Sequence, residues 1–223
     1  MKNKLIEDKI GVYFQQQIDK DFEKIEKLIP YPLILSELEA MTSELFRLLH
    51  ELDNMKILPV FSNKNGLIQT CNYAIEDSQS VIREYLQLTI CEFEKVKYLA
   101  LYGLLQAFFV QQDSLKTLFK TCLKREIDFK NDYKELYQIR EIRNITIGHP
   151  TNKGKNYFLI SQQTLKKSHY YLIGHDESDK KKGQEIEIIP KMILDQQNGI
   201  LNLFHELINE LEKMKKSPAA NII

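Results

Sequence analysis

Hydrophobic residues recur every three to four positions along most of this chain, which is the spacing of one face of a helix. Proline residues at positions 30 and 32 end the first such stretch, and Pro190 suits the first turn of the last one. The pattern covers residues 5–29, 33–55, 67–123, 128–147 and 190–216, and the third range is long enough for two helices or one very long helix. It therefore predicts a mostly helical protein.

Two short stretches after residue 156 have a different pattern. Aromatic and β-branched residues run from Tyr157 to Ile160 and from Tyr170 to Ile173, with polar residues between them, which predicts a β-hairpin at about residues 156–175. Alternation over residues 185–189 predicts a third short strand. The expected fold is mostly α: a helical bundle with a small β-hairpin insertion before the last helix. Residues 1–216 form one domain in this prediction, and residues 217–223 a flexible tail.

The size and charge of the chain narrow its class. Its 223 residues are enough for one sizeable core, and 31 basic residues balance 31 acidic ones, so no overall charge attracts nucleic acid or membrane. The charge is uneven, however: residues 116–155 hold 10 basic and 5 acidic residues. Residues 58–66, with Pro59 and the sequence Asn63-Lys64-Asn65-Gly66, are expected to form a loop.

Cysteine spacing and apolar runs predict a soluble, cytoplasmic protein without metal or cofactor. Cys71, Cys91 and Cys122 fit no zinc or redox motif, and the N-terminal residues lack the apolar core of a signal peptide. The most apolar run, residues 98–110, is too short to span a bilayer. It is expected to be buried on nearly all sides, either in the core or at a subunit interface. His175 and Asp176 lack the partner spacing of a metal site.

The segment Arg143-Asn144-Ile145-Thr146-Ile147-Gly148-His149-Pro150 combines residues suited to chemistry with a helix end. On a helix, Arg140, Arg143 and Asn144 share a face, whereas His149 points about 120° away from Arg143. We expect Gly148 to adopt the left-handed conformation that ends helices and Pro150 to block continuation. His149 can then fold back beside Arg143, and Asn144 can hold the turn by bonding to nearby backbone.

Arginine and histidine together suit phosphodiester cleavage. Arginine presents a charged fork of donors to phosphate oxygens, and histidine exchanges protons near neutral pH. An RNA 2′-hydroxyl can attack the adjacent phosphate without a metal if a base takes its proton and a cation stabilises the developing charge. The spacing alone also fits an Arg143 that pairs with an acidic neighbour and a Gly148-His149-Pro150 sequence that only ends a helix.

Arg143-Asn144, four further residues and then His149 at the end of a helix resemble the motif of the HEPN family. In that family an Arg, often followed by Asn, precedes a His by four to six intervening residues; here there are five. The resemblance implies a helical homodimer whose two motifs meet at the two-fold axis. It implies a metal-independent endoribonuclease of toxin–antitoxin or antiviral systems, with Arg143 and His149 catalytic and Asn144 as a helper. Thr151 occupies the place where one branch of the family has a modifiable tyrosine.

A supporting residue from the preceding helix is also implied by the resemblance, and Gln111, Gln112 and Asp113 are candidates. Arg140, on the same helix face as Arg143, is a further possible supporting residue. The expected partners are RNA, a second copy of the chain and an antitoxin protein, with no membrane. Two alternatives stay open. One is a non-catalytic HEPN-like module that binds RNA, a nucleotide or a protein, and the other is a helical dimerisation protein without a site.

Overall fold

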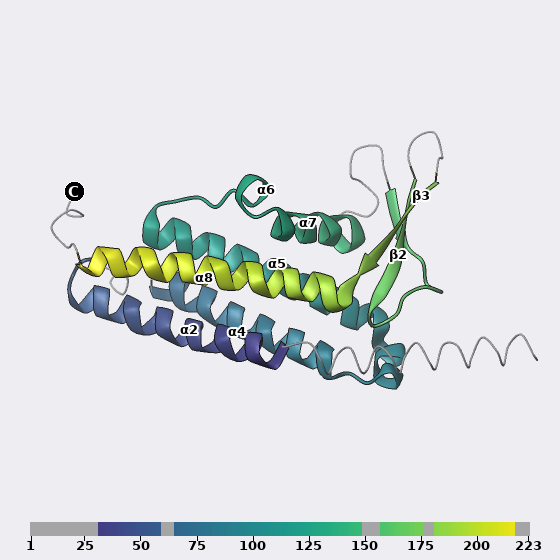
Figure 1. Ribbon diagram of the computed structural model, residues 1–223, viewed down its shortest axis with the longest axis horizontal. Coiled ribbons are helices and arrows are strands. Elements are labelled where there is room, and N and C mark those ends of the chain that lie inside the picture. The colour runs from purple at the N-terminus through teal and green to yellow at the C-terminus, as the bar shows by residue number, and fades with distance from the viewer. Residues whose placement is uncertain (1–30, 59–64, 149–156, 176–180, 217–223) are drawn as a thin grey trace, which may run out of the picture.

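A computed structural model describes residues 31–58, 65–148, 157–175 and 181–216 of the chain. The helix expected at residues 5–29 and the tail at 217–223 lie outside these ranges. Four long helices run along the long axis of the molecule (Figure 1): α2 (Tyr31–Asn54), α4 (Asn65–Gln87), α5 (Ile90–Leu123) and α8 (Ile193–Lys216). The mostly helical prediction is confirmed.

The long helical stretch at residues 67–123 is two helices. α5 begins with a capping box in which the Thr89 side chain accepts from the Glu92 backbone N–H and the Glu92 carboxylate accepts from the Thr89 N–H. Val96 has non-helical backbone angles, so α5 is kinked near its start. α4 begins at Asn65, so Asn65 and Gly66 belong to the helix. The loop predicted at residues 58–66 is therefore too long at its C-terminal end.

The stretch expected as one helix over residues 128–147 is divided into three pieces. Asp128 caps the short α6 (Phe129–Asp132), and Tyr133, with φ −137° and ψ 70°, separates it from α7 (Lys134–Arg143). Residues Asn144–Gly148 continue α7 as a π-helical turn, η1. α6 and α7 lie along one side of the bundle (Figure 1), so the two arginines of α7 face a long helix.

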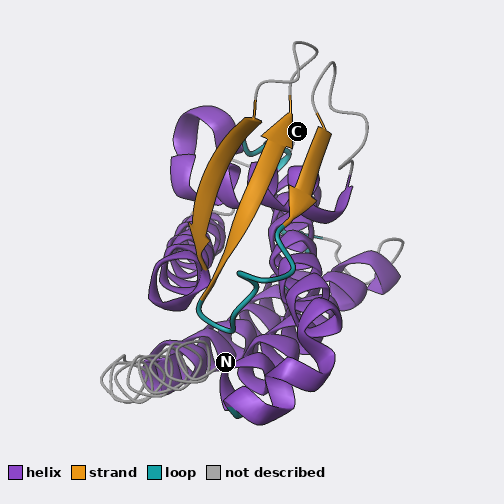
Figure 2. Cartoon of the chain, turned by 90° about the vertical axis from the view of Figure 1, so that its right-hand side faces the viewer, coloured by secondary structure: helices purple, strands orange, loops and turns teal. Residues whose placement is uncertain are grey.

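The predicted hairpin is present and is part of a three-stranded antiparallel sheet. Its strands are β1 (Tyr157–Ile160), β2 (His169–His175) and β3 (Lys181–Glu187), in the order β1-β2-β3. The third strand begins earlier than expected and ends before residue 188, where a π-helical turn, η2 (Ile188–Met192), leads into α8. The sheet lies at one end of the bundle, ahead of the last helix (Figure 2). Pro190 is therefore in the turn before α8.

The core consists of two apolar clusters. The first joins α2, α4, α5 and α8 around Leu45, Leu118 and Phe204, and the second joins α4 and α5 to the sheet around Phe108 and Tyr170. On α4, α5 and α8, buried glutamines lie in sequence between the residues of one cluster and those of the other: Gln79, Gln111, Gln112, Gln196 and Gln197. The core is therefore interrupted by a band of buried polar side chains.

Residues 98–110 are not buried on nearly all sides, which corrects the sequence prediction. One side of this part of α5 holds core residues such as Leu104 and Phe108, but Leu99 is 74% exposed and Tyr102 is 43% exposed. The apolar run therefore has an outer side that the described residues of one chain leave uncovered.

The described residues contain neither a cluster able to hold a metal nor a helix with the length and apolarity needed to cross a bilayer. All three cysteines are free; Cys91 is exposed, whereas Cys71 and Cys122 are buried. Burial raises the pKa of the Cys122 thiol to about 12, so this cysteine behaves as a core residue.

Gly199 allows α8 to approach α7 closely, and its replacement by alanine should destabilise the protein. A Cβ at this position would lie 2.7 Å from both Cγ and Cδ2 of Leu136, which is itself buried. Alanine normally stabilises a helix by up to ~1 kcal/mol relative to glycine, but overpacking costs about 1–3 kcal/mol. We expect a net loss of about 1 kcal/mol in urea unfolding. Gly66→Ala is the control, because its Cβ meets no atom within 4 Å; an equally stable Gly199→Ala protein would contradict the close packing.

Candidate functional site

Two arginines of α7 stack against one aromatic ring of α5. The guanidinium carbon of Arg140 lies 4.3 Å from the centroid of the Phe109 ring, and that of Arg143 lies 4.2 Å from the same centroid. Each such contact favours a guanidinium by about 0.5–1 kcal/mol where it is exposed. The ring thus holds two positive groups near each other, in the part of the chain where the sequence has its basic excess.

Arg140 is tied to the long helix through an acidic and an amide side chain. Its Nη1 donates to Oδ1 of Asp113 at 2.8 Å and lies 3.4 Å from Oε1 of Gln112. Gln112 in turn donates to Oε1 of the buried Gln196 on α8. Arg140 and Asp113, both expected as supporting residues, are therefore brought together as an ion pair, which neutralises the charge of Arg140.

Arg143 is held differently, because its acceptors are neutral. Nη2 donates to Oε1 of Gln106 at 2.9 Å, and Nη1 donates to Oδ1 of Asn144 at 3.2 Å. Its Nε is buried and has no hydrogen-bond partner. The other four arginines, all within the described ranges, each pair with a carboxylate: Arg47, Arg83, Arg125 and Arg140. In the part of the chain that the structure describes, Arg143 is thus the arginine whose charge no acid offsets.

The π-helical turn after Arg143 brings Gly148 against the guanidinium. A Cβ at Gly148 would lie 2.7 Å from Nη1 of Arg143 and 3.4 Å from Oδ1 of Asn144. The φ of Gly148 lies outside the left-handed range, so the expected left-handed helix end is wrong. The described helix ends in a π turn instead, and such turns occur often at functional sites. Because Gly148 has no side chain, it leaves space for the Arg143 guanidinium.

Asn144 has a role other than the predicted bond to nearby backbone. Its side-chain oxygen accepts from the Arg143 guanidinium. Asn144 and Gln106 therefore hold the fork of Arg143 from two elements, η1 and α5. Neither acceptor carries a charge, so they fix the orientation of the guanidinium without reducing its attraction for an anion.

The β-sheet supports the π turn. Thr146 is buried, and its hydroxyl forms a 2.9 Å hydrogen bond with the hydroxyl of Tyr170 on β2. Tyr170 is fully buried, and this burial raises the pKa of its phenol. The hairpin insertion therefore fixes the position of η1, and through it the position of Gly148 relative to Arg143.

His149, the predicted proton-transfer residue, lies outside the described residues, as do Pro150 and Thr151. It is the residue that directly follows Gly148 in the chain, and a Cβ added at Gly148 would lie 2.7 Å from Nη1 of Arg143. Of the predicted site, the described residues bring together Arg143, Asn144, Arg140 and Asp113.

Gln106 and Phe109 are contacts that the sequence analysis did not predict. They lie within the apolar run 98–110, where Phe109 resembles a core residue and Gln106 a surface residue. Both lie on the side of α5 that faces Arg143. One clue was available, because Gln106, Phe109 and Asp113 are spaced at three- and four-residue intervals and so share a helix face.

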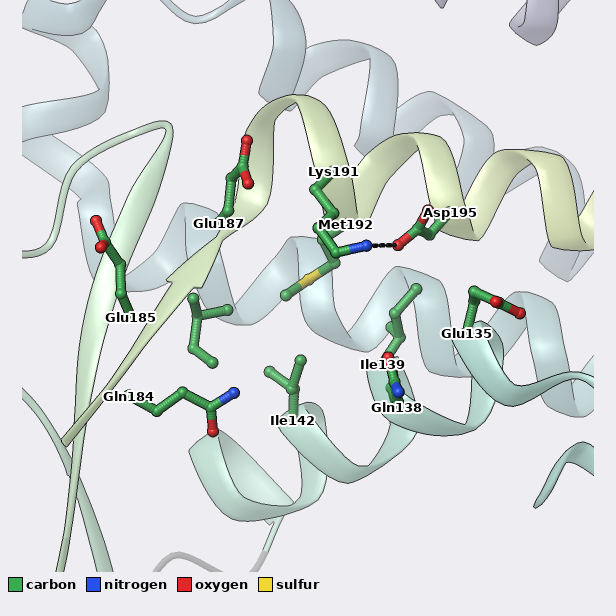
Figure 3. A pocket seen from close by; sticks show the side chains of 11 residues that line it. Glu135, Gln138, Ile139, Ile142, Gln184, Glu185, Glu187, Lys191, Met192 and Asp195 are labelled. Carbon is green, nitrogen blue, oxygen red and sulfur yellow. Dashed lines mark hydrogen bonds and ion pairs between the residues drawn. The ribbon is translucent and has the colours of Figure 1, made fainter. Parts of the chain in front are cut away.

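A cavity on another side of α7 has mostly acidic residues among its charged lining, in contrast to the surroundings of Arg143 (Figure 3). This cavity of about 220 Å³ lies between α7, β3 and the start of α8, with Ile139, Ile142 and Met192 among its apolar lining residues. Its charged lining residues are Glu135, Glu185, Glu187, Asp195 and Lys191. Lys191 already pairs with Asp195 at 2.8 Å. The excess of carboxylates disfavours a phosphate there, so an anionic ligand is expected on the Arg143 side.

No family model, curated protein or solved structure matches this chain. The resemblance to the HEPN family therefore rests on the short motif at Arg143–Pro150 and stays a prediction. The function has to be argued from the geometry around Arg143.

Proposed function

We propose that this protein is a HEPN-type, metal-independent endoribonuclease that acts as a homodimer in the cytoplasm, in a toxin–antitoxin or antiviral-defence role. The observation that carries the proposal is the environment of Arg143. This guanidinium is stacked on Phe109, oriented by the neutral Gln106 and Asn144, and left without a carboxylate. A preoriented cation of this kind suits a phosphate oxygen on which charge develops during reaction.

The proposed chemistry is attack of an RNA 2′-oxygen on the neighbouring phosphorus. The O2′–P bond forms and the P–O5′ bond breaks, while a proton leaves the 2′-hydroxyl and a proton reaches the departing 5′-oxygen. Arg143 binds the non-bridging oxygens, and His149 takes part in proton transfer, because histidine side chains exchange protons near neutral pH. The products are a 2′,3′-cyclic phosphate and a 5′-hydroxyl end.

Incubation of purified protein with mixed structured and unpaired RNAs in EDTA tests this proposal. Wild type should leave 2′,3′-cyclic phosphate ends, and His149→Ala should cleave at least 10²-fold more slowly with an unchanged fold. Equal cleavage by both proteins would exclude the assignment of His149. RNA binding without cleavage would instead support a non-catalytic binding module. Growth arrest on expression of wild type, but not of His149→Ala, would support a toxin role. An antitoxin could then be sought by its ability to relieve the growth arrest.

A surface suited to the proposed homodimer lies between α4 and α5, where Leu99 is about two helical turns from Gln106. An apolar groove of about 260 Å³ lies between α4 and α5, and its lining residues include Val81, Val96, Ala100 and Gly103. The largely exposed Leu99 lies at the same groove. A projecting side chain beside a groove is self-complementary under two-fold symmetry, because each copy can place its Leu99 in the groove of the other.

Leu99→Asp should therefore shift the protein from dimer to monomer. A carboxylate in an apolar interface loses its hydration without a partner, which costs several kcal/mol. Sedimentation velocity across a dilution series is the measurement. Leu33→Asp is a matched control, since Leu33 is 67% exposed on α2. A dimer that survives Leu99→Asp, or a wild-type protein that is monomeric, would show that this groove is not the dimer surface.

A further inference from the structure

Three aromatic residues of α5 form a row that leads to the Arg143 site. Tyr98, Tyr102 and Phe109 are spaced by four and seven residues, so their directions differ by only about 40° around the helix axis. The non-helical residue inside α5, Val96, precedes all three. The row is therefore on a regular part of the helix.

The outer two rings of the row are accessible. Tyr98 is 37% exposed and Tyr102 is 43% exposed, and their rings meet edge to face with centroids 6.3 Å apart. The third ring, Phe109, carries the guanidiniums of Arg140 and Arg143. From the rise of a helix, Tyr102 lies about 6 Å along the axis from Tyr98 and about 10 Å from Phe109.

The row is separate from the apolar groove assigned to the second copy of the chain. Of the groove residues, Gly103 points about a third of a turn away from the row and Leu99 about a quarter of a turn away. Gln106, which holds Arg143, is one turn beyond Tyr102 and points about 40° away from it around the helix axis. A ligand that binds Arg143 can thus extend along Tyr102 and Tyr98 while α4 and α5 contact another copy.

We propose that Tyr98 and Tyr102 are a base-stacking surface that selects unpaired RNA, with the phosphate at Arg143. This inference rests on the proposed function, because it concerns the substrate of the same site. Unpaired bases can leave their neighbours and stack on aromatic side chains, whereas bases in a duplex are already stacked and paired. The uncompensated guanidinium attracts the backbone, and the tyrosines add a preference that a charge alone does not supply.

The test is RNA binding by the His149→Ala protein, which keeps the row and Arg143 but is expected not to cleave. Its affinity is measured for a short unpaired RNA of mixed sequence and for the same RNA annealed to its complement. Tyr98→Leu and Tyr102→Leu should each weaken binding of the unpaired RNA about 10-fold and leave duplex binding unchanged. Tyr98→Phe and Tyr102→Phe keep the ring and should bind within about 2-fold of the parent.

Tyr73→Leu is the matched control, because Tyr73 is an exposed tyrosine on α4 outside the row. Unchanged affinity for unpaired RNA in both leucine variants would overturn the proposal. An equal loss of binding to duplex RNA would also overturn the proposal. So would a loss that accompanies a change in dimer mass, since the two tyrosines would then form a protein contact.

If wild type does not cleave but tyrosine-dependent binding holds, the nuclease proposal alone fails. If wild type cleaves and the leucine variants cleave with unchanged KM, the stacking proposal alone fails. If the protein binds no RNA, the nuclease proposal and the stacking proposal both fail.

Discussion

Arg143→Lys should reduce RNA cleavage nearly as severely as Arg143→Ala, by about 10³-fold in kcat/KM. Lysine keeps the positive charge but loses the planar fork. The fork makes two contacts in different directions, to Gln106 and to Asn144, while its face lies on Phe109. An ammonium group cannot reproduce this arrangement, so it would meet the phosphate without a fixed orientation.

Cleavage of one fluorescent RNA by wild type, Arg143→Lys and Arg143→Ala measures this effect. Arg125→Lys is the control, because Arg125 also stacks on a ring, that of Phe119, but pairs with Glu206. It should cleave like wild type. Activity of Arg143→Lys within about 3-fold of wild type would show that charge alone matters at this position. Melting temperatures should stay close to that of wild type in all these proteins, since no ion pair is lost at Arg143.

The fold was predictable where one pattern governed an element from end to end. α2, α8 and the hairpin each follow their hydrophobic spacing, and the structure confirms them. Breaks inside helices were harder to predict from the sequence. Tyr133 interrupts the segment at residues 128–147 by its backbone angles, although tyrosine is not a residue that excludes a helix.

The exposure of α5 shows a second limit of the sequence pattern. Apolar content in residues 98–110 predicted burial, yet Leu99 and Tyr102 face outward. Burial of an apolar side chain lowers the free energy, but the sequence does not show whether the same chain or another molecule covers that side chain. A subunit interface was the alternative prediction for this run, and the exposed side of α5 is compatible with it.

The sequence indicated some residues of the candidate site but not its geometry. Arg143, Asn144, Arg140 and Asp113 were all named, and the structure brings them together. Gln106, the acceptor that α5 supplies to Arg143, depends on a tertiary contact between helices that are distant in sequence. The π turn depends on the bond between Thr146 and Tyr170, which joins η1 to the hairpin. Sequence spacing within the motif contains neither.

Gly148→Ala should lower kcat for RNA cleavage about 10²-fold without unfolding the protein. The added Cβ would lie 2.7 Å from Nη1 of Arg143, closer than such atoms approach, so one of them has to move. The backbone at Gly148 is not left-handed and accepts alanine without strain. The obstructing atom is at the end of a flexible side chain, so the guanidinium moves instead of the helix. A displacement of about 1 Å at a catalytic group costs on the order of 10²-fold in rate.

The decisive comparison is kcat, KM and thermal unfolding for Gly148→Ala beside Gly66→Ala, which adds the same methyl group in open space. A lower kcat with an unchanged melting temperature would assign Gly148 to the positioning of Arg143. Full activity would mean that the guanidinium does not need its contact with η1. Loss of folding in Gly148→Ala alone would mean that the glycine is required by the π turn itself, because then the chain, and not the arginine side chain, fails to accommodate the methyl group.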